Sequence, residues 1–106
     1  MGNQSLFLRI FGDSPVLRVM DFFMVYEDFD YSMKDIARKA GLGYATLKLF
    51  WPDLIKQKIV KQTRTVGKAK LFQLNFQNPV VQQFRKLYWT AIKNKTEKLL
   101  SVKVKC

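Results

Sequence analysis

The chain has 106 residues, of which 48% are hydrophobic and 14% aromatic, so it can bury the core of one domain and is not expected to be disordered. Its net charge of +11 is uneven, because residues 1–31 carry 2 basic and 5 acidic side chains while residues 32–106 carry 17 and 3, and such a surplus predicts a polyanionic partner for the second part. The absence of histidine and the single cysteine exclude histidine-activated nucleophiles, histidine-ligated metals and a disulfide within the chain, so no catalytic residue, metal or cofactor is expected.

The N-terminal segment, residues 1–12, is expected to contribute to the core or to a dimer contact. Its run QSLFLRIF fits a short helix or a strand, and Gly12 ends that run. The apolar side chains available for either contact are Phe7, Leu8 and Phe11.

The first long helix is predicted to begin at Pro15, whose missing N–H costs nothing at a first helical position, with Asp13 or Ser14 as the N-cap. Its residues are apolar on most sides, which is typical of the central helix of a small core. An acidic run, residues 27–31, follows. Because its carboxylates face varied directions, we interpret this run as a solvated loop rather than a metal site.

Two helices joined by a tight turn are predicted next. Ser32 caps the first of them, and Gly41 ends it in the left-handed conformation that helix C-termini favour. A turn of about three residues leads to a further helix that begins near Tyr44. Its inward stripe consists of Leu47, Phe50 and Leu54. This spacing indicates a helix-turn-helix, which is either a DNA-reading element or an ordinary corner of a helical core.

Pro52 interrupts the regular pattern of this helix. Inside a helix, proline removes one hydrogen bond and costs roughly 3 kcal/mol. The helix is therefore expected either to kink near Phe50 and Trp51 or to end there. Trp51 is expected to pack against the following hairpin or the first long helix rather than to stack on nucleic acid.

A β-hairpin is predicted from two alternating runs, residues 59–65 and 71–76, joined by a glycine-containing turn. The hairpin is basic at and near its tip, where the cations are Arg64, Lys68 and Lys70. A hairpin of this composition directly after a helix-turn-helix favours nucleic-acid binding over the ordinary helical corner.

A long C-terminal helix, residues 78–106, is predicted to begin at Asn78 and Pro79 and allows two interpretations. Its basic side chains form a second DNA-contacting surface in the first: Arg85, Lys86, Lys93, Lys95 and Lys98. In the second, its apolar stripe exceeds what a small domain can cover and pairs with the same helix of a second subunit. That stripe comprises Phe84, Leu87, Tyr88, Ala91 and Ile92, and we favour the homodimer.

The order of these elements resembles that of winged helix-turn-helix transcriptional regulators of the archaeal kind. The resemblance is carried by the phrases FGDSPVLRVMDFF, DFDYSMKDIARKAGLGYATL and IVKQTRTVGKAKLFQLNFQNPVV. It implies a mostly α fold with a small β-hairpin (α+β), in which residues 13–77 form the winged helix-turn-helix and residues 78–106 the dimerising helix. In that family the third helix enters the major groove of double-stranded DNA, and the hairpin, or wing, touches the flanking backbone or the minor groove.

Carried over residue by residue, the resemblance assigns DNA contacts to two segments. The recognition helix would use Gly43, Tyr44, Ala45, Thr46, Lys48 and Leu49, and the wing would use Arg64, Lys68 and Lys70. Lys48 can reach a guanine edge or a phosphate, and Thr46 suits phosphate oxygens. Because the helix set lacks Arg, Asn and Gln, the usual bidentate base readers, DNA shape or wing contacts are expected to carry part of the specificity.

The expected function is therefore a homodimeric DNA-binding transcriptional regulator of the cytoplasm. The alternatives are a winged-helix interaction module of the transcription or replication machinery and a non-specific nucleic-acid coating or RNA-binding protein. No enzyme is expected, because no acid, base and nucleophile converge. The apolar stretches fall far below the ~20 residues that cross a bilayer, so no membrane partner is expected. No small-molecule effector can be inferred from the residues.

Overall fold

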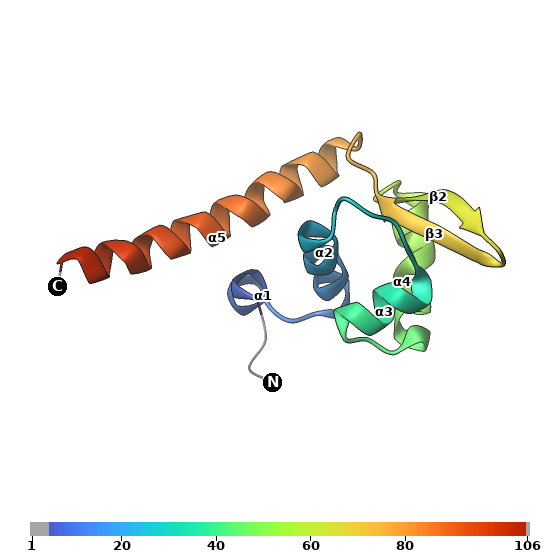
Figure 1. Ribbon diagram of the computed structural model, residues 1–106, viewed down its shortest axis with the longest axis horizontal. Helices are drawn as coiled ribbons and strands as arrows, with labels where there is room; N and C mark the ends of the chain where they lie inside the picture. Colours follow the sequence, from blue (N-terminus) through green and yellow to red (C-terminus); the bar gives the residue numbers. More distant parts are fainter. Residues whose placement is uncertain (1–4, 106) are drawn as a thin grey trace.

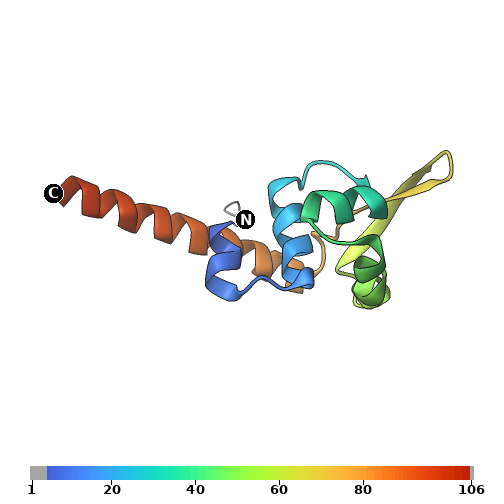
Figure 2. The same cartoon turned by 90° about the horizontal axis from the view of Figure 1, so that it is seen from below.

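The computed structural model describes the backbone of residues 5–105 and the side chains of residues 5–93. The molecule measures 56 × 31 × 22 Å, with a β-hairpin at one end of its long axis and the far end of the last helix at the other (Figure 1, Figure 2). In chain order its elements are α1 (Leu6–Phe11), α2 (Pro15–Val25), β1 (Tyr31–Ser32), α3 (Met33–Ala40), α4 (Tyr44–Lys56), β2 (Val60–Val66), β3 (Ala69–Leu74) and α5 (Pro79–Lys105).

The described residues confirm a mostly α fold with a small β-sheet (α+β). The sheet is antiparallel with strand order β1-β3-β2, so the predicted hairpin of β2 and β3 is confirmed. The sequence does not predict β1, which pairs Tyr31 with Phe72 and Ser32 with Leu71. A strand of two residues is too short for the alternation that identifies strands in a sequence.

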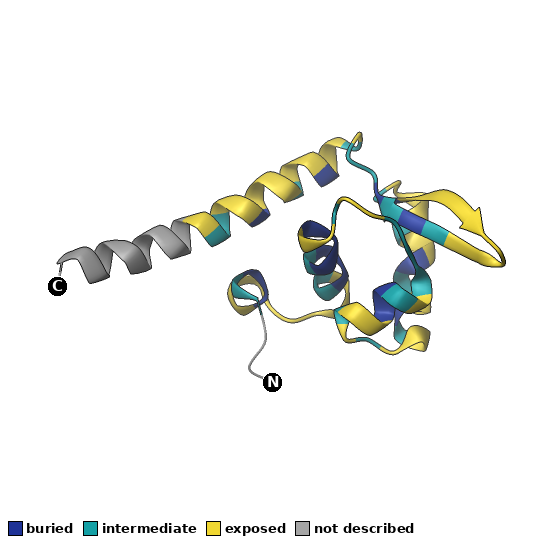
Figure 3. Cartoon of the chain, in the orientation of Figure 1, coloured by how far each residue is buried: buried dark blue, intermediate teal, exposed yellow. Residues whose placement is uncertain are grey.

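The core is built around α2, as its apolar sequence predicts. Val19 and Phe23 are fully buried there, together with residues of α1, α3, α4, β2, β3 and α5. In Figure 3 the buried segments of the helices turn toward this centre, while most of the hairpin is exposed. The N-terminal run is the helix α1, whose Phe7 and Leu8 are buried in the same core, whereas Phe11 remains 46% exposed.

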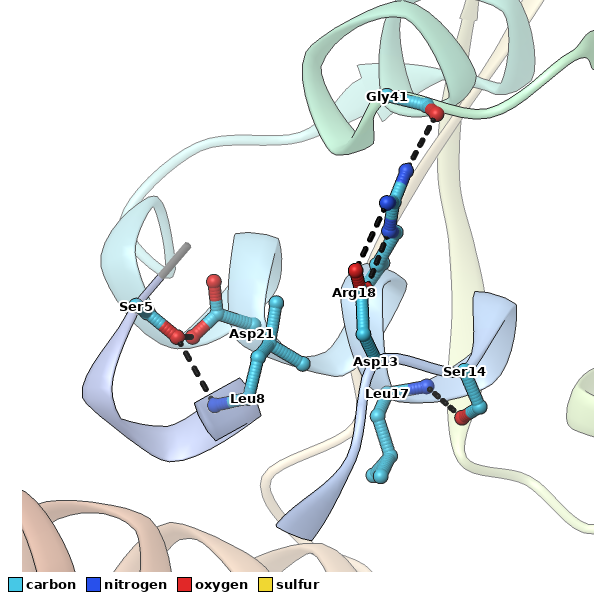
Figure 4. A network of polar contacts seen from close by, with 8 residues as sticks. All are labelled: Ser5, Leu8, Asp13, Ser14, Leu17, Arg18, Asp21 and Gly41. Atoms are coloured by element: carbon cyan, nitrogen blue, oxygen red, sulfur yellow. Dashed lines mark hydrogen bonds and ion pairs between the residues drawn. The ribbon is translucent and has the colours of Figure 1, made fainter. Parts of the chain in front are cut away.

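The helix-turn-helix forms as predicted from its local signals. The Ser32 hydroxyl accepts the N–H of Asp35 at 3.2 Å and caps α3, and Gly41 ends the helix with a φ of 77°. The side chain of Arg18 on α2 binds the turn between α3 and α4. Its Nη1 donates to the Gly41 carbonyl oxygen at 2.8 Å, while its Nη2 donates to the carboxylate of Asp13 at 2.9 Å (Figure 4).

Helix α4 runs through Pro52 to Lys56, so the expected alternative in which the helix ends near Trp51 is wrong. Leu47 and Trp51 are both buried on its inner side. Burying such side chains contributes about 1.5–3 kcal/mol each, which offsets the roughly 3 kcal/mol that an internal proline costs. The Trp51 ring packs edge-on against Phe72 of β3 with centroids 5.1 Å apart, which confirms its packing against the hairpin.

Helix α5 is fastened to the body at its N-terminal half. The Tyr88 hydroxyl donates to Oδ1 of Asp21 on α2 at 2.6 Å, and the Ser5 hydroxyl donates to the same oxygen at 2.8 Å (Figure 4 draws the Ser5 contact). Burial, followed by the contact with Asp21, raises the pKa of Tyr88 above its usual range. The remaining turns of α5 project away from the body (Figure 1). In the described part of the chain, no helix has a stretch apolar and long enough to cross a membrane.

Candidate nucleic-acid interface

The exposed face of α4 contains four of the six helix positions that the sequence assigns to DNA, and Gly43, which is also exposed, is the N-cap of this helix. Leu49 is 81% exposed and Tyr44 is 41% exposed, and Ala45 and Lys48 also face solvent. Thr46 is half-buried. Leu47 is fully buried, so the inward direction predicted for this residue is confirmed and the opposite side of α4 is open to a partner.

The ring of Tyr44, the first residue of α4, is close to two ammonium groups. Nζ of Lys48 is 5.3 Å from the centre of its ring, and Nζ of Lys34 from α3 is 6.0 Å from it. Distances of this size allow cation–π attraction between each ammonium group and the ring. The tyrosine ring therefore joins a cation of α3 to a cation of α4, and Lys34 is absent from the residues that the sequence assigns to DNA.

A surface groove of about 430 Å³ separates the start of α3 and α4 from the hairpin tip. We call it the lysine groove. It is lined by Ser32, Met33, Lys34, Tyr44, Lys68, Ala69, Lys70 and Phe72, and Lys48 borders it through its contact with Tyr44. None of these lining residues is acidic. The structure thus brings the start of the recognition helix and two of the three predicted wing residues to one surface.

The third predicted wing residue, Arg64, lies on the other face of the hairpin. The register pairs Arg64 with Leu71, whereas Lys70 shares its side of β3 with the buried Phe72. A β-bulge between Gln62 and Arg64 interrupts the pairing at this point. The sequence places Arg64 with Lys68 and Lys70, but the structure separates it from them.

Arg64 is held on this outer face by Asp30. Its Nε and Nη2 donate to the two carboxylate oxygens at 3.0 and 3.1 Å, and the Thr63 hydroxyl also donates to Asp30. The hydrogen bonds from Arg64 and then from Thr63 lower the pKa of Asp30 from its ordinary 3.8 to about 2. Asp30 precedes β1, so the pair ties β2 across the sheet to the loop after α2.

Arginines and lysines are used differently across the described side chains. Each ion pair found among them joins an arginine to a carboxylate: Arg18 with Asp13, Arg38 with Asp35, Arg64 with Asp30, and Arg85 with Glu27. No lysine of this part of the chain takes part in an ion pair. Four acidic residues thus pair with arginines, whereas the described lysines keep their charges without a carboxylate partner.

The predicted dimer contacts on α5 divide into inner and outer residues. Tyr88 is buried in its own chain and Phe84 is half-buried, and both rings pack on Phe7 of α1 with centroids 4.9 and 5.3 Å from it. Tyr88 is therefore a core residue and is not accessible to a second subunit. Leu87 is 47% exposed, and Ala91 and Ile92 are half-buried.

The basic side of α5 is also open in part. Lys86 and Lys93 are exposed, whereas Arg85 pairs with Glu27 at 2.6 Å. The side chains of Lys95 and Lys98 lie outside the described residues.

Lys34 lines the lysine groove, although the sequence does not point to it. One local signal is available: it sits in the first turn of α3, where a positive charge opposes the helix dipole. Its nearness to Tyr44 depends on the turn angle between two helices, which the sequence pattern does not specify.

The structure resembles solved winged-helix regulators. A ZitR mutant of Lactococcus lactis in apo form matches with a TM-score of 0.65 at 16% identity, covering 80% of this chain and 67% of that one. The adhesin competence repressor AdcR from Streptococcus pyogenes matches at 0.60 and 14% identity, over 91% and 73% of the two chains. Sso10a-2, a DNA-binding protein from Sulfolobus solfataricus, matches at 0.54 and 11% identity, over 85% and 94%.

These likenesses establish the winged-helix fold and nothing finer. Wild-type ZitR has also been solved in complex with DNA, and this chain spans 57% of that protein's chain. No protein-family model matches the sequence, and no curated protein does. The matched structures come from Lactococcus, Streptococcus and Sulfolobus, so the archaeal kind that the sequence resembles stays a prediction.

Proposed function

We propose that the protein binds double-stranded DNA and regulates transcription, with the exposed face of α4 in the major groove and the wing on the flanking backbone or minor groove. The observation that carries the proposal is the lysine groove, where Tyr44 of α4 and the wing residues Lys68 and Lys70 line one surface. A helix and a wing that reach the same side can contact one duplex together. Neighbours of the same fold bind DNA, which supports the class of partner.

Electrostatics supports a phosphate-rich partner. The lysines at this surface have no carboxylate near them in the lining, so their charges are fully available to phosphates. A protein with about 6–10 phosphate contacts loses roughly 10³–10⁵-fold in affinity between 50 and 200 mM salt. The outward residues of α4 lack bidentate base readers, so DNA shape carries a share of the sequence preference.

The proposed active form is a homodimer. Leu87 on α5 and the neighbouring α1 residues Ile10 and Phe11 are 46–49% exposed, and α1 and α5 pack against each other. An isologous contact through this surface would cover it. A twofold dimer would then present two copies of α4 to major grooves about 34 Å apart, which predicts a palindromic site.

Two other functions predict different results in DNA-binding experiments. A coating protein would show the same salt dependence but would lose any single site to excess random duplex, whereas a regulator keeps it. An interaction module of the transcription or replication machinery would keep its protein partner at high salt and bind DNA only loosely. Selection from a pool of random duplexes separates these cases, and a regulator is expected to enrich a palindrome.

The direct test removes one lysine from each half of the interface. Lys48→Ala combined with Lys68→Ala is expected to weaken duplex binding well beyond tenfold in a fluorescence-anisotropy titration, because two phosphate-directed charges are lost. The matched control is Lys86→Ala combined with Lys93→Ala, which removes two exposed charges from α5. Unchanged affinity of the first variant would end the proposal, and a larger loss in the second would move the DNA surface to α5.

A further inference from the structure

Lys34 is an exposed lysine at the start of α3, and no carboxylate pairs with it among the described side chains. It lies in the first turn of α3, where the helix dipole repels a cation, and its ammonium group shares the Tyr44 ring with that of Lys48. Lys68 and Lys70 face it across the groove. None of the residues that line this part of the described surface is acidic, so an anionic ligand would meet several lysine charges there and no carboxylate.

The groove is lined by both apolar and cationic side chains. Met33, Ala69 and Phe72 supply the apolar lining, and the lysines come from α3 and from the hairpin. Ser32, which also lines the groove, accepts the N–H of Asp35, and this contact leaves its own hydroxyl hydrogen available for donation. A fitting ligand is therefore elongated and presents anionic groups beside apolar ones.

The groove is continuous with the exposed face of α4, because Tyr44 belongs to both. One ligand that follows this surface must therefore satisfy the lysines of α3, α4 and the wing together. A DNA strand has this chemistry, since its phosphates are anionic and its deoxyribose rings are largely apolar. A free phosphate ion would satisfy one or two of the lysines and would leave the apolar lining uncovered.

We propose that the lysine groove holds the sugar–phosphate backbone of one DNA strand, and that Lys34 is a phosphate contact supplied by the first helix of the helix-turn-helix. Tyr44 acts as a positioning residue, because its ring is within cation–π distance of the ammonium groups of both Lys34 and Lys48. The inference rests on the DNA binding proposed above and adds to it a strand path and a contact from α3.

The test compares two lysines of the same helix. Lys34→Gln and Lys39→Gln remove the same charge from exposed positions of α3, but the Lys39 ammonium group lies over the Tyr26 ring at 5.6 Å and lines a different surface cavity, beside Arg18. Affinity for a selected DNA duplex is measured at several salt concentrations. Because the two variants have equal net charge, any long-range effect of charge is the same in both.

Lys34→Gln is expected to weaken binding roughly tenfold and to reduce the slope of log K against log salt by about 0.9 for each bound protomer. Lys39→Gln is expected to keep the wild-type slope. The melting temperature of Lys34→Gln should equal or exceed that of the wild type, because the replaced charge opposes the helix dipole. In a Tyr44→Leu background the effect of Lys34→Gln should shrink, because the ring no longer holds the ammonium group in place.

The possible results separate the two proposals. If the wild type binds duplex and both glutamine variants keep its slope, the strand does not pass Lys34, so the groove inference fails while DNA binding stands. Equal losses in both variants would likewise overturn the inference, because they would reflect net charge alone. If the wild type binds no duplex at any salt concentration, both proposals fail.

Discussion

The positive charges on the two faces of the wing differ in whether a carboxylate pairs with them. On the outer face, Arg64 is fixed by both oxygens of Asp30, and this pair ties the wing to the body. On the groove face, Lys68 and Lys70 stand beside an apolar lining without a carboxylate. The comparison shows that a cation's partner, rather than its place in the sequence, separates a structural charge from one available to a ligand.

Reversing a charge on the groove face of the wing is expected to have the largest effect on DNA binding. Lys70→Glu is expected to lower duplex affinity well beyond tenfold, because the new carboxylate repels the phosphates that the lysine would attract. The matched control, Lys61→Glu, reverses a charge on the same hairpin at a position paired with Gln73, on the outer face. It is expected to change affinity about tenfold less, in titrations at one salt concentration. Equal effects of the two variants would remove the distinction between the faces.

Asp30→Asn tests whether Arg64 anchors the wing or contacts DNA, because the two roles predict opposite changes in duplex affinity. If Arg64 anchors the wing, loss of the carboxylate loosens the hairpin and lowers duplex affinity by about threefold, even though the protein gains one positive charge. If Arg64 contacts DNA, the variant frees its guanidinium group and affinity rises. We expect the decrease, measured by the same titration with Lys61→Gln as a wing variant that leaves Asp30 in place.

The pH dependence of the unfolding free energy tests whether the Asp30–Arg64 pair on the outer face stabilises the fold. The pKa of Asp30 is lowered to about 2 from 3.8, so its ionised form favours the folded state above pH 3.8, and this contribution is lost as the pH falls toward 2. Wild-type protein is therefore expected to lose unfolding free energy more steeply than Asp30→Asn in this window, in urea titrations followed by circular dichroism. Parallel curves for the two proteins would show that the pair contributes no stability.

The smallest effect is expected from Arg64→Lys. The charge remains, but an ammonium group cannot reproduce the two parallel hydrogen bonds that the guanidinium group makes with Asp30. Duplex affinity should stay within about twofold of the wild type, since exposed ion pairs contribute little. A loss of duplex affinity beyond tenfold would show that Arg64 contacts DNA and needs the paired N–H groups of its guanidinium group to do so.

The fold follows from the sequence wherever its signals are local. Ser14 and Ser32 cap their helices, Gly41 takes the left-handed conformation that ends α3, and Gly67, with a φ of 61°, supplies the positive φ that a two-residue hairpin turn requires. The continuation of α4 through Pro52 was not decided by such signals, because it depends on tertiary packing.

The candidate site is predictable only in part, for the same reason. The direction of Lys48 and Leu49 follows from the position of buried Leu47 on one helix. The pairing of Arg64 with Asp30 joins residues 34 positions apart, and the β-bulge beside Arg64 cannot be read from alternation alone. The approach of Lys34 to Tyr44 likewise depends on the angle between α3 and α4.

We propose that the exposed face of α4 and the groove face of the wing form one DNA-binding surface. Backbone amide chemical shifts followed by NMR during titration with a selected duplex test it most directly. The account predicts the largest shifts at Lys34, Tyr44, Lys48, Lys68 and Lys70, with small changes at Lys61 and Phe29. Shifts concentrated on α5, with the groove residues unmoved, would contradict it.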